Sequence, residues 1–457
     1  MAVSRRVVVI GGGIAGLAAG FRLMRTPGVE VEVLEADSRA GGAIATSREE
    51  GFLLEHGPDC FLTVKPAAID LCKALGLENR LIGTIAENRR SFVARKSKLL
   101  PVPEGFYLMA PSSIASLATS RIFSAKGKAR MAMEPLISRR TDPADESLAS
   151  FVRRRLGQEC LDRLAQPMIA GITTADPEKL SMRAAMPQFP EMEEAHGSIV
   201  GALAARALSR GTSGPRYGMF ATLDGGMQVL VDALAAALGP RLRTGVRVNA
   251  LGRDGAKWTL ESSGGALRTD AIVLALPAAA AASLLRPRDG QLANLLAAIE
   301  SASVATVHVA WKEEDLPLPA AMGFVVPAIE NRFTLACSFT SRKFPGRAPA
   351  GTSLLRIFAG GATRPADASL PEADLTQRVI AELRDLLGAK REPLFCRVDR
   401  HADAMPQYHV GHLDRVAEIE SRAAALPGLS LCGASYRGVG VPDCILSGER
   451  AAEIAAG

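Results

Sequence analysis

The segment Arg6-Val-Val-Val-Ile-Gly-Gly-Gly-Ile-Ala-Gly16 predicts a buried strand, a tight turn and the start of a helix. Its first half is a continuous apolar run rich in β-branched residues, which is typical of a parallel strand buried on both faces. Gly11, Gly13 and Gly16 then form the pattern GxGxxG in the strand–turn–helix context that this motif requires. The first glycine permits the turn, the second lets the backbone approach a pyrophosphate, and the third lets helix pack on strand.

The residues after the motif complete the prediction of a dinucleotide site. A helix-compatible run leads to a second strand at residues 29–35, and Glu35 stands at its end. A carboxylate there accepts hydrogen bonds from an adenosine ribose and repels a 2′-phosphate. The free N–H groups at the start of the helix would face the phosphates. The expected contacts are Gly11, Gly12, Gly13, Ile14, Ala15, Gly16, Glu35 and Ala36.

Length and composition are those of an ordinary globular protein. The chain has 457 residues, 48% of them hydrophobic and 22% charged, with a formal net charge of +6. At ~150 residues per domain, this length predicts about three structural units. The longest stretch without a charge, residues 105–120, is shorter than the ~20 apolar residues of a spanning helix, so no integral membrane protein is expected. Aromatic residues make up only 5%, which argues against a nucleic-acid partner.

The cysteine and histidine patterns argue against metal or redox sites. Seven cysteines are present, and no two lie closer than 12 positions, which excludes Cys-x-x-Cys motifs and fits a reducing cytoplasm. His409 and His412 are three residues apart, but Pro406 and Gly411 predict a loop rather than a metal-binding helix face. We therefore expect a cytoplasmic protein without a metal site.

Two further glycine-rich segments favour FAD over a nicotinamide cofactor. Beyond Glu35 the chain continues Arg39-Ala-Gly-Gly-Ala43, where paired glycines let the backbone pass close to phosphates and a ribityl chain. Near the C-terminus, Gly438-Val-Gly-Val441 precedes a small-residue helix with a proline in its first turn. The positive end of that helix would stabilise the negative charge of reduced flavin. Both ends of the chain would then build one site, which an NAD dehydrogenase does not need.

The paired-glycine segment resembles the motif of a large flavoprotein family that contains amine oxidases, phytoene desaturases and protoporphyrinogen oxidases. Five further segments, in family order across almost the whole chain, resemble its oxygen-dependent porphyrinogen oxidases. They are residues 52–62, 151–157, 170–172, 405–412 and 438–445. The similarity is closest to the soluble bacterial branch, which includes enzymes acting on coproporphyrinogen III, whereas the human-like branch acts on protoporphyrinogen IX. Ala43 replaces a second arginine of many members, as is typical of the porphyrinogen branch.

The resemblance implies six-electron oxidation of a porphyrinogen by FAD, with molecular oxygen reoxidising the flavin and hydrogen peroxide released. The flavin would be non-covalent, because residues 404–408, where some amine oxidases attach it, contain no cysteine. No catalytic side chain is expected, since the flavin carries the chemistry. The implied cofactor contacts are Arg39, Gly42, Ala43, Gly57, Pro58, Asp59, Cys60, Val248, Val439, Gly440 and Val441. The implied substrate contacts are Asp59, Lys65, Arg90, Gly171, Val325 and Phe358.

The substrate positions fit a flat apolar macrocycle that carries propionates, which needs apolar walls and a few cations. An arginine that pairs with a propionate in the human-like branch falls on Ser91, next to Arg90, which weakens the argument for protoporphyrinogen. Alternatively, Lys65 and Arg90 are ordinary surface charges, and Val325 and Phe358 are ordinary core residues.

The predicted fold is α/β, with a discontinuous Rossmann-like FAD-binding domain, a mixed-sheet substrate domain and a helical domain. The FAD domain is expected at residues 1–85, 215–290 and 428–457, including a strand around residues 245–248. The sheet domain is expected at 86–109 and 291–427, where β-rich runs include residues 333–340 and 394–397. The helical domain is expected at 110–214.

Partners and alternative functions stay open at this point. Basic residues between 105 and 140 suggest peripheral contact with the inner face of the cell membrane, with a solvated helical face as the alternative. Hand-over of product to a ferrochelatase-type enzyme and a homodimer are further hypotheses. An amine oxidase would need an aromatic cage, for which four tyrosines and two tryptophans leave little material, although Lys312 could mimic that family's lysine near the flavin. A phytoene desaturase and a non-enzymatic carrier on the same fold fit the motifs less well.

Overall fold

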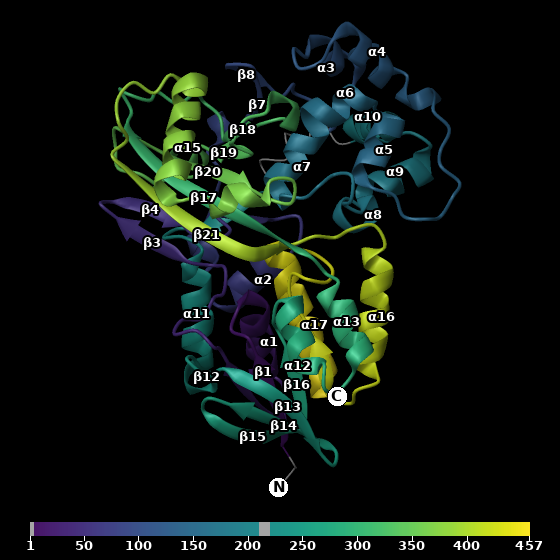
Figure 1. The fold of residues 1–457 in the computed structure, drawn as a ribbon, viewed down its shortest axis with the longest axis vertical. Coiled ribbons are helices and arrows are strands. Elements are labelled where there is room, and N and C mark those ends of the chain that lie inside the picture. The colour runs from purple at the N-terminus through teal and green to yellow at the C-terminus, as the bar shows by residue number, and fades with distance from the viewer. Residues whose placement is uncertain (1–3, 210–219) are drawn as a thin grey trace.

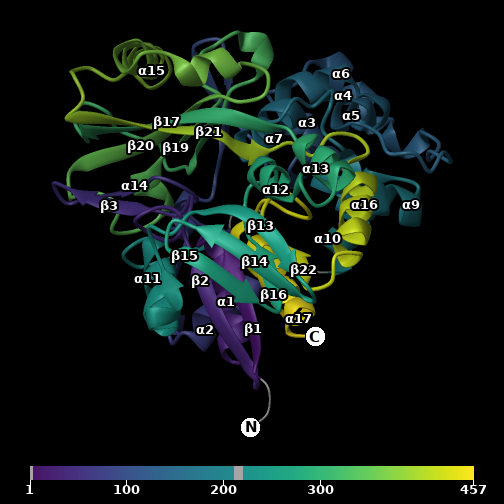
Figure 2. The same cartoon turned by 60° about the horizontal axis from the view of Figure 1, so that its bottom comes forward.

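The computed structural model describes residues 4–209 and 220–457 of the chain. Five parallel strands form its central sheet, in the order β12-β2-β1-β16-β22 (Figures 1 and 2). These strands come from the start, the middle and the end of the chain, so distant segments meet in one sheet. Their bounds are Arg5–Ile10 for β1, Val29–Leu34 for β2, Leu242–Arg243 for β12, Ala271–Leu274 for β16 and Leu429–Leu431 for β22. The arrangement confirms the predicted α/β class with a Rossmann-like unit.

Strand β1 lies in the middle of this sheet because its side chains are buried on both faces. Val7 and Val9 pack in one core cluster with α1, α11 and α17, and Val8 packs in a second cluster on the opposite face. Burial of each valine contributes roughly 1.5–3 kcal/mol. The covering elements are α1 (Ile14–Met24), α11 (Gln228–Leu238) and α17 (Val441–Ala456) on one face, and β13 (Val248–Asp254), β14 (Lys257–Ser262), β15 (Gly265–Thr269), α12 (Ala278–Leu285), α13 (Gly290–Ala297) and α16 (His412–Ala424) on the other.

A second, mixed sheet of seven strands has the order β21-β17-β20-β19-β18-β7-β8. One of its faces packs on helix α15 through alternating apolar residues such as Val307 and Val309. The opposite face carries polar side chains and contacts the segment after β4. The bounds are Phe92–Arg95 for β7, Lys98–Pro101 for β8, Ser301–Lys312 for β17, Gly323–Val325 for β18, Ala336–Ser338 for β19, Thr352–Gly360 for β20, Phe395–Pro406 for β21 and Glu372–Leu387 for α15.

Helices α3 to α10 form a third unit beside the seven-stranded sheet (Figure 1). Arg155 and Glu134 form a fully buried ion pair within it, and the Ser198 hydroxyl donates to the same carboxylate. Among the described residues, no helix is both long enough and apolar enough to cross a membrane. The helices are α3 (Ile114–Thr119), α4 (Ala125–Ala132), α5 (Leu148–Arg155), α6 (Gln158–Cys160), α7 (Gln166–Thr173), α8 (Met182–Ala185), α9 (Gln188–His196) and α10 (Ile199–Ser209).

Shorter elements connect these units. The hairpin β3–β4 leads the chain from the parallel sheet to the polar face of the seven-stranded sheet. Strand β11 lies between β5 and β6, and β9 pairs with β10. The bounds are Thr46–Glu49 for β3, Phe52–Glu55 for β4, Phe61–Leu62 for β5, Leu81–Gly83 for β6, Phe106–Tyr107 for β9, Ala110–Pro111 for β10, Phe220–Leu223 for β11, Ala67–Ala74 for α2 and Thr340–Lys343 for α14.

Three predicted strands differ from the observed ones. The strand expected around residues 245–248 is misplaced, because β12 ends at Arg243, Gly245 turns with φ +72° and β13 begins only at Val248. The run at residues 333–340 forms only the short strand β19, whereas the run at 394–397 begins the 12-residue strand β21. That strand continues to Pro406 because it lies at the sheet edge, where proline is tolerated. The predicted boundary at residues 214–215 lies outside the described residues.

Candidate active site

The glycine-rich turn between β1 and α1 has the geometry that its sequence predicts. Gly11 has φ +107°, and a Cβ there would lie 2.4 Å from the Ala275 carbonyl oxygen. A Cβ on Gly16 would lie 1.9 Å from the Gly11 carbonyl oxygen, so helix and strand can pack this closely only with glycine. A Cβ on Gly13 would meet no atom within 4 Å. Gly13 therefore borders open space at the start of α1, where a phosphate can approach the backbone.

Two helices begin near the same edge of the parallel sheet, because α1 follows β1 and α17 follows β22. Their caps are Gly13 and Gly440, and neither helix has a side-chain cap. The helices cross closely, since a Cβ on Gly448 would lie 2.1 Å from the Ala15 carbonyl oxygen. Uncapped N–H groups and the positive ends of two helix dipoles attract anions. The predicted residues Ile14, Ala15 and Val441 lie in the first turns of these helices.

Glu35 follows β2 and is held by the backbone around it. Its carboxylate accepts hydrogen bonds from the N–H of Gly12 at 2.6 Å and of Asp37 at 2.8 Å. A Cβ on Gly12 would lie 2.9 Å from the Glu35 Cβ, so this approach requires glycine. Each carboxylate oxygen can accept a further hydrogen bond. The N–H of Val246 donates to the Glu35 carbonyl oxygen at 2.8 Å, which brings Val248, two residues further on, near Glu35. Ala36 is the residue directly after Glu35.

The paired-glycine loop lies against the first glycine-rich turn. The N–H of Gly41 donates to the Gly12 carbonyl oxygen at 2.7 Å. The Arg39 guanidinium donates to the carbonyl oxygens of Gly42 at 2.7 Å and Ile44 at 2.9 Å. Arg39 therefore fixes the loop from within, and its predicted contact with the cofactor stays a prediction.

The segment after β4 passes between the two sheets. A Cβ on Gly57 would lie 1.8 Å from the Ala43 carbonyl oxygen, so this segment touches the paired-glycine loop and needs glycine there. The Arg356 guanidinium, on β20, donates to the carbonyl oxygens of Gly57 at 2.5 Å and His56 at 3.2 Å. Pro58 follows Gly57, and its ring fixes the φ angle at that position. The seven-stranded sheet thus fixes a backbone segment that the motif resemblance places along the flavin.

A buried ion pair joins this segment to α14. The Lys343 ammonium lies 2.7 Å from the Asp59 carboxylate and 3.3 Å from the Cys60 sulfur. Burial alone would raise the pKa of Asp59, but attraction to Lys343 and its hydrogen bond hold that pKa well below the usual range. Burial and the Asp59 charge raise the pKa of the Cys60 thiol to about 12. Asp59 is therefore ionised at neutral pH, whereas Cys60 is a neutral thiol and not a nucleophile.

Sequence motifs did not reveal Lys343 or Arg356 as site residues. Lys343 ends a helix of only four residues in an ordinary basic run, and Arg356 lies in an apolar strand. The one sequence signal for Arg356 is that it is the single arginine in this strand. Burial of an unpaired guanidinium is unfavourable, so an arginine in a buried strand indicates hydrogen-bond acceptors nearby. Lys312, in contrast, lies at the exposed end of β17.

The C-terminal glycine turn is held by residues of the segment 405–412. Gly438 has φ +154°, and its N–H donates to the Tyr408 hydroxyl at 2.8 Å. That hydroxyl donates to the Ala434 carbonyl oxygen at 2.5 Å. The Tyr408 ring stacks on His412, whose ring centroid is 4.0 Å away. Burial lowers the pKa of His412 to about 4, so the neutral ring donates from Nε2 to the Tyr436 carbonyl oxygen.

Replacing Tyr408 with phenylalanine is expected to lower the free energy of unfolding by about 1–3 kcal/mol, because the buried N–H of Gly438 loses its acceptor. Flavin affinity should fall as well, since Gly438 begins the turn before α17. Denaturant unfolding and flavin titration measure the two effects. Tyr107→Phe is the matched control, because the Tyr107 hydroxyl has no partner among the described residues and its ring contact with Phe189 is kept. Equal stability of the two variants would contradict this role.

The structure brings three of the predicted substrate residues together. A Cβ on Gly171 of α7 would lie 3.3 Å from Val325 and 3.5 Å from Ala336. Ala336 lies opposite Phe358 in the pairing of β19 with β20. Val325 and the predicted flavin contact Val439 both border the core of the helical unit. An apolar wall thus forms where the helical unit meets the seven-stranded sheet.

The two predicted cations lie elsewhere. Lys65 forms an ion pair with Asp443, in which Nζ is 2.7 Å from both carboxylate oxygens, and half of its side chain is exposed. Asp443 stands in the first turn of α17, so Lys65 lies near the C-terminal end of the site. Arg90 is exposed, and its guanidinium has no partner among the described residues. Its carbonyl oxygen accepts the N–H of Met322, just before β18.

The polar face of the seven-stranded sheet is incompletely hydrogen-bonded. The hydroxyl of Thr306 and the Nε of Arg356 on this face are buried and have no partner among the described residues, and the same holds for the hydroxyl of Thr340 on α14. Buried polar atoms are rarely left unpaired, so another group or ordered water completes this region. Together with the open space at Gly13 and the two uncapped helices, these residues fit a bound flavin dinucleotide.

These features define a class of protein: a flavoprotein with a Rossmann-like unit. Residues 14–456 match the model of the flavin containing amine oxidoreductase family. The chain belongs to this family, and the oxidoreductase and flavoprotein predictions are thereby confirmed.

The similarity to individual proteins covers nearly the full chain. The chain is 35% identical to the coproporphyrinogen III oxidase of Bacillus subtilis (strain 168), across 98% of this chain and 97% of that protein. It is 32% identical to the chloroplastic protoporphyrinogen oxidase of Nicotiana tabacum, across 98% and 84%. The crystal structure of a protein described as a putative protoporphyrinogen oxidase from Exiguobacterium sp. 255-15 superposes with a TM-score of 0.89, at 30% identity and 99% coverage of both chains. The resemblance inferred from the motifs is confirmed.

Proposed function

We propose that the protein is an FAD- and oxygen-dependent porphyrinogen oxidase of haem biosynthesis, with coproporphyrinogen III as its preferred substrate. The observation that carries the proposal is the full-length similarity to coproporphyrinogen III oxidases, joined to a site with the helix ends and glycine turns that a flavin dinucleotide needs. Loss of six electrons and six hydrogens to three oxygen molecules yields one porphyrin and three hydrogen peroxide. A bound FAD supplies the hydride acceptor for this chemistry.

The flavin is non-covalent in this proposal. Cys60 and Cys444 lie beside the two segments predicted to flank it, and burial with a neighbouring carboxylate raises the pKa of each thiol to about 12. Protonated thiols are poor nucleophiles. Glu35 would accept the ribose hydroxyls, and the uncapped starts of α1 and α17 would receive the pyrophosphate and the flavin edge.

Protein side chains would bind and orient the porphyrinogen. Gly171, Val325 and Phe358 supply the apolar wall along the macrocycle. Asp59 stays ionised beside Lys343, so it can accept a hydrogen bond from a pyrrole N–H but cannot serve as a general acid at neutral pH. Lys65 and Arg90 are the cations proposed for the propionates.

Replacing Lys65 with methionine is expected to raise KM for coproporphyrinogen III about fivefold with kcat nearly unchanged. Lys65 is half exposed, and an ion pair with a propionate at such a position would contribute up to about 1 kcal/mol. Arg90→Met should act in the same direction. Steady-state porphyrin formation measures both. Lys73→Met is the matched control. Lys73 lies on α2, is similarly exposed, and pairs with Glu78 in the 3-10 helix that follows. An unchanged KM in both site variants would refute the cation assignment.

The overall reaction is tested by its stoichiometry. Purified holoenzyme supplied with coproporphyrinogen III in air should form coproporphyrin III and three equivalents of hydrogen peroxide. Protoporphyrinogen IX is the parallel substrate, and a primary amine is the control for the amine oxidase alternative. Peroxide formation with the amine and not with either porphyrinogen would reject the proposal.

Location and protein partners stay predictions. Exposed Met133 and Leu136 follow the basic helix α4, which supports peripheral membrane contact by the helical unit. The cytoplasm as compartment is proposed on the cysteine pattern and the motif resemblance. A homodimer and hand-over of product to a ferrochelatase-type enzyme are proposed on the motif resemblance alone.

A further inference from the structure

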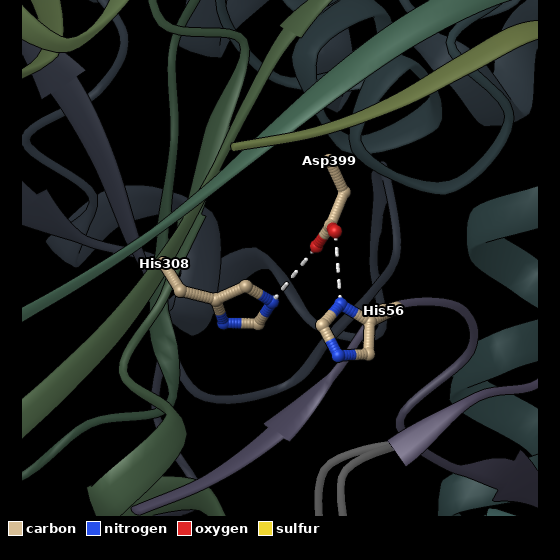
Figure 3. A group of neighbouring side chains, drawn as sticks. All are labelled: His56, His308 and Asp399. Carbon is tan, nitrogen blue, oxygen red and sulfur yellow. Dashed lines mark hydrogen bonds and ion pairs between the residues drawn. The ribbon is translucent and has the colours of Figure 1, made fainter. Parts of the chain in front are cut away.

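Three potential metal ligands, two from strands and one from the segment after β4, converge on the polar face of the seven-stranded sheet. His56 follows β4, His308 lies in β17 and Asp399 lies in β21 (Figure 3). Strands β17 and β21 are neighbours, and the pairing places His308 two residues along from the partner of Asp399. One donor atom from each side chain lies within 4.8 Å of the others.

Two of the three ligands have unsatisfied atoms that point at each other. His308 is fully buried, and neither ring nitrogen has a hydrogen-bond partner among the described residues. The Oδ2 atom of Asp399 is likewise buried and unpaired. Figure 3 shows the His308 Nε2 directed at this carboxylate, with the His56 ring on the carboxylate's other oxygen. A fully buried imidazole without partners requires another group beside it.

The separations suit ligands of one ion. Nε2 of His308 lies 3.5 Å from Oδ2 of Asp399, which is long for a hydrogen bond. Two ligand atoms bound at about 2.0–2.1 Å to one tetrahedral ion lie roughly 3.3–3.5 Å apart. His56 Nδ1 is 2.8 Å from Oδ1 of Asp399. A small outward shift of the His56 ring would give the separation expected for two ligands of one ion. We propose that His56, His308 and Asp399 form a binding site for a divalent transition metal ion.

The ligand set and its surroundings select the kind of ion. Two imidazoles with one carboxylate suit zinc and similar first-row metals, whereas magnesium and calcium prefer oxygen ligands. The buried Arg356 guanidinium donates to the His56 and Gly57 carbonyl oxygens and so fixes the backbone that carries His56. Three protein ligands leave one position for water.

The metal would link the segment between the two sheets to strands β17 and β21. His56 directly precedes Gly57, so an ion held at these ligands would stiffen the connection between the parallel-sheet unit and the seven-stranded sheet. This structural role lies beyond the proposed function and does not depend on it. The ligands are far apart in the sequence and fall on separate strands, which is why no ligand spacing revealed them.

Zinc content of the holoenzyme tests the site. After chelator treatment and dialysis against Zn²⁺, we expect one zinc per chain by elemental analysis and a higher melting temperature, both reversed by chelator. Cobalt substitution should give visible ligand-field bands without thiolate charge-transfer absorption, which separates this site from the buried cysteines. His308→Asn and Asp399→Asn should lose the zinc, whereas the exposed-histidine control His196→Asn should keep it.

Two results would overturn the proposal. One is wild-type protein that retains no stoichiometric zinc after dialysis. The other is a His308→Asn variant, or the milder His56→Asn variant at a partly exposed ligand, that retains as much zinc as the His196→Asn control. Because metal content is measured without substrate, failure of the porphyrinogen proposal would leave this result unaffected.

Discussion

Replacing Gly13 with glutamate is expected to give a folded protein that does not bind flavin. A Cβ at this position meets no atom within 4 Å, and φ lies outside the region that demands glycine, so the backbone accepts the new side chain. The carboxylate would occupy the start of α1 and repel the pyrophosphate there. We expect flavin affinity to fall by at least about 100-fold, equivalent to about 2.7 kcal/mol. The purified variant should be colourless.

The matched control is Gly290→Glu. Gly290 also opens a helix, α13, with free space for a Cβ. Asp289 caps this helix, which packs on the opposite face of the parallel sheet from α1. Flavin titration and thermal unfolding of both variants separate loss of binding from loss of folding. A Gly13→Glu protein with a normal flavin spectrum would show that the phosphates do not lie at this turn.

Replacing Lys343 with methionine is expected to lower the free energy of unfolding by about 3–5 kcal/mol at neutral pH, because Asp59 would remain buried without its partner. Both side chains of the pair are less than one-fifth exposed, so solvent screens the interaction only weakly. Denaturant unfolding measures the loss. Lys257→Met is the surface control, where the more exposed pair with Asp270 should contribute about 1 kcal/mol at most.

Two further measurements identify the cause of this loss. The double variant Lys343→Met/Asp59→Asn should recover most of the stability, because it no longer buries the Asp59 carboxylate without its lysine partner. The folded-state pKa of Asp59 lies below its unfolded value, so the pair stabilises the protein above about pH 4 and loses that effect as the pH falls further. The difference between wild type and Lys343→Met should therefore narrow as the pH drops through about 4. A constant difference, or no recovery in the double variant, would show that Lys343 acts through packing alone.

Local patterns predicted the parallel-sheet unit well, because its signals lie within a few residues of each other. The apolar run before Gly11 forms the central strand, and the spacing to Gly16 sets the turn and the helix. In the structure, close contacts exclude a Cβ at Gly11 and Gly16, whereas Gly13 borders open space. Prediction was weaker at residues 245–248, where a glycine turn separates two short strands that a pattern of apolar residues cannot distinguish.

Contacts between distant strands could not be predicted from local sequence. Lys343 pairs with Asp59 only because α14 follows a strand of the second sheet, and Arg356 reaches Gly57 only because β20 lies over that segment. The side chains of His308 and Asp399 meet through the register of β17 with β21, which includes a bulge that sequence does not show. Strand pairing, not residue type, assembles this part of the site.

Anaerobic mixing of the holoenzyme with coproporphyrinogen III shows whether the bound flavin oxidises this substrate. We expect the flavin absorbance to bleach without oxygen, one coproporphyrinogen to reduce three flavins, and coproporphyrin III to appear in step. Admission of oxygen should restore the oxidised spectrum with release of hydrogen peroxide. Flavin that stays oxidised with both coproporphyrinogen III and protoporphyrinogen IX, yet bleaches with a primary amine, would rule out a porphyrinogen oxidase and favour an amine oxidase.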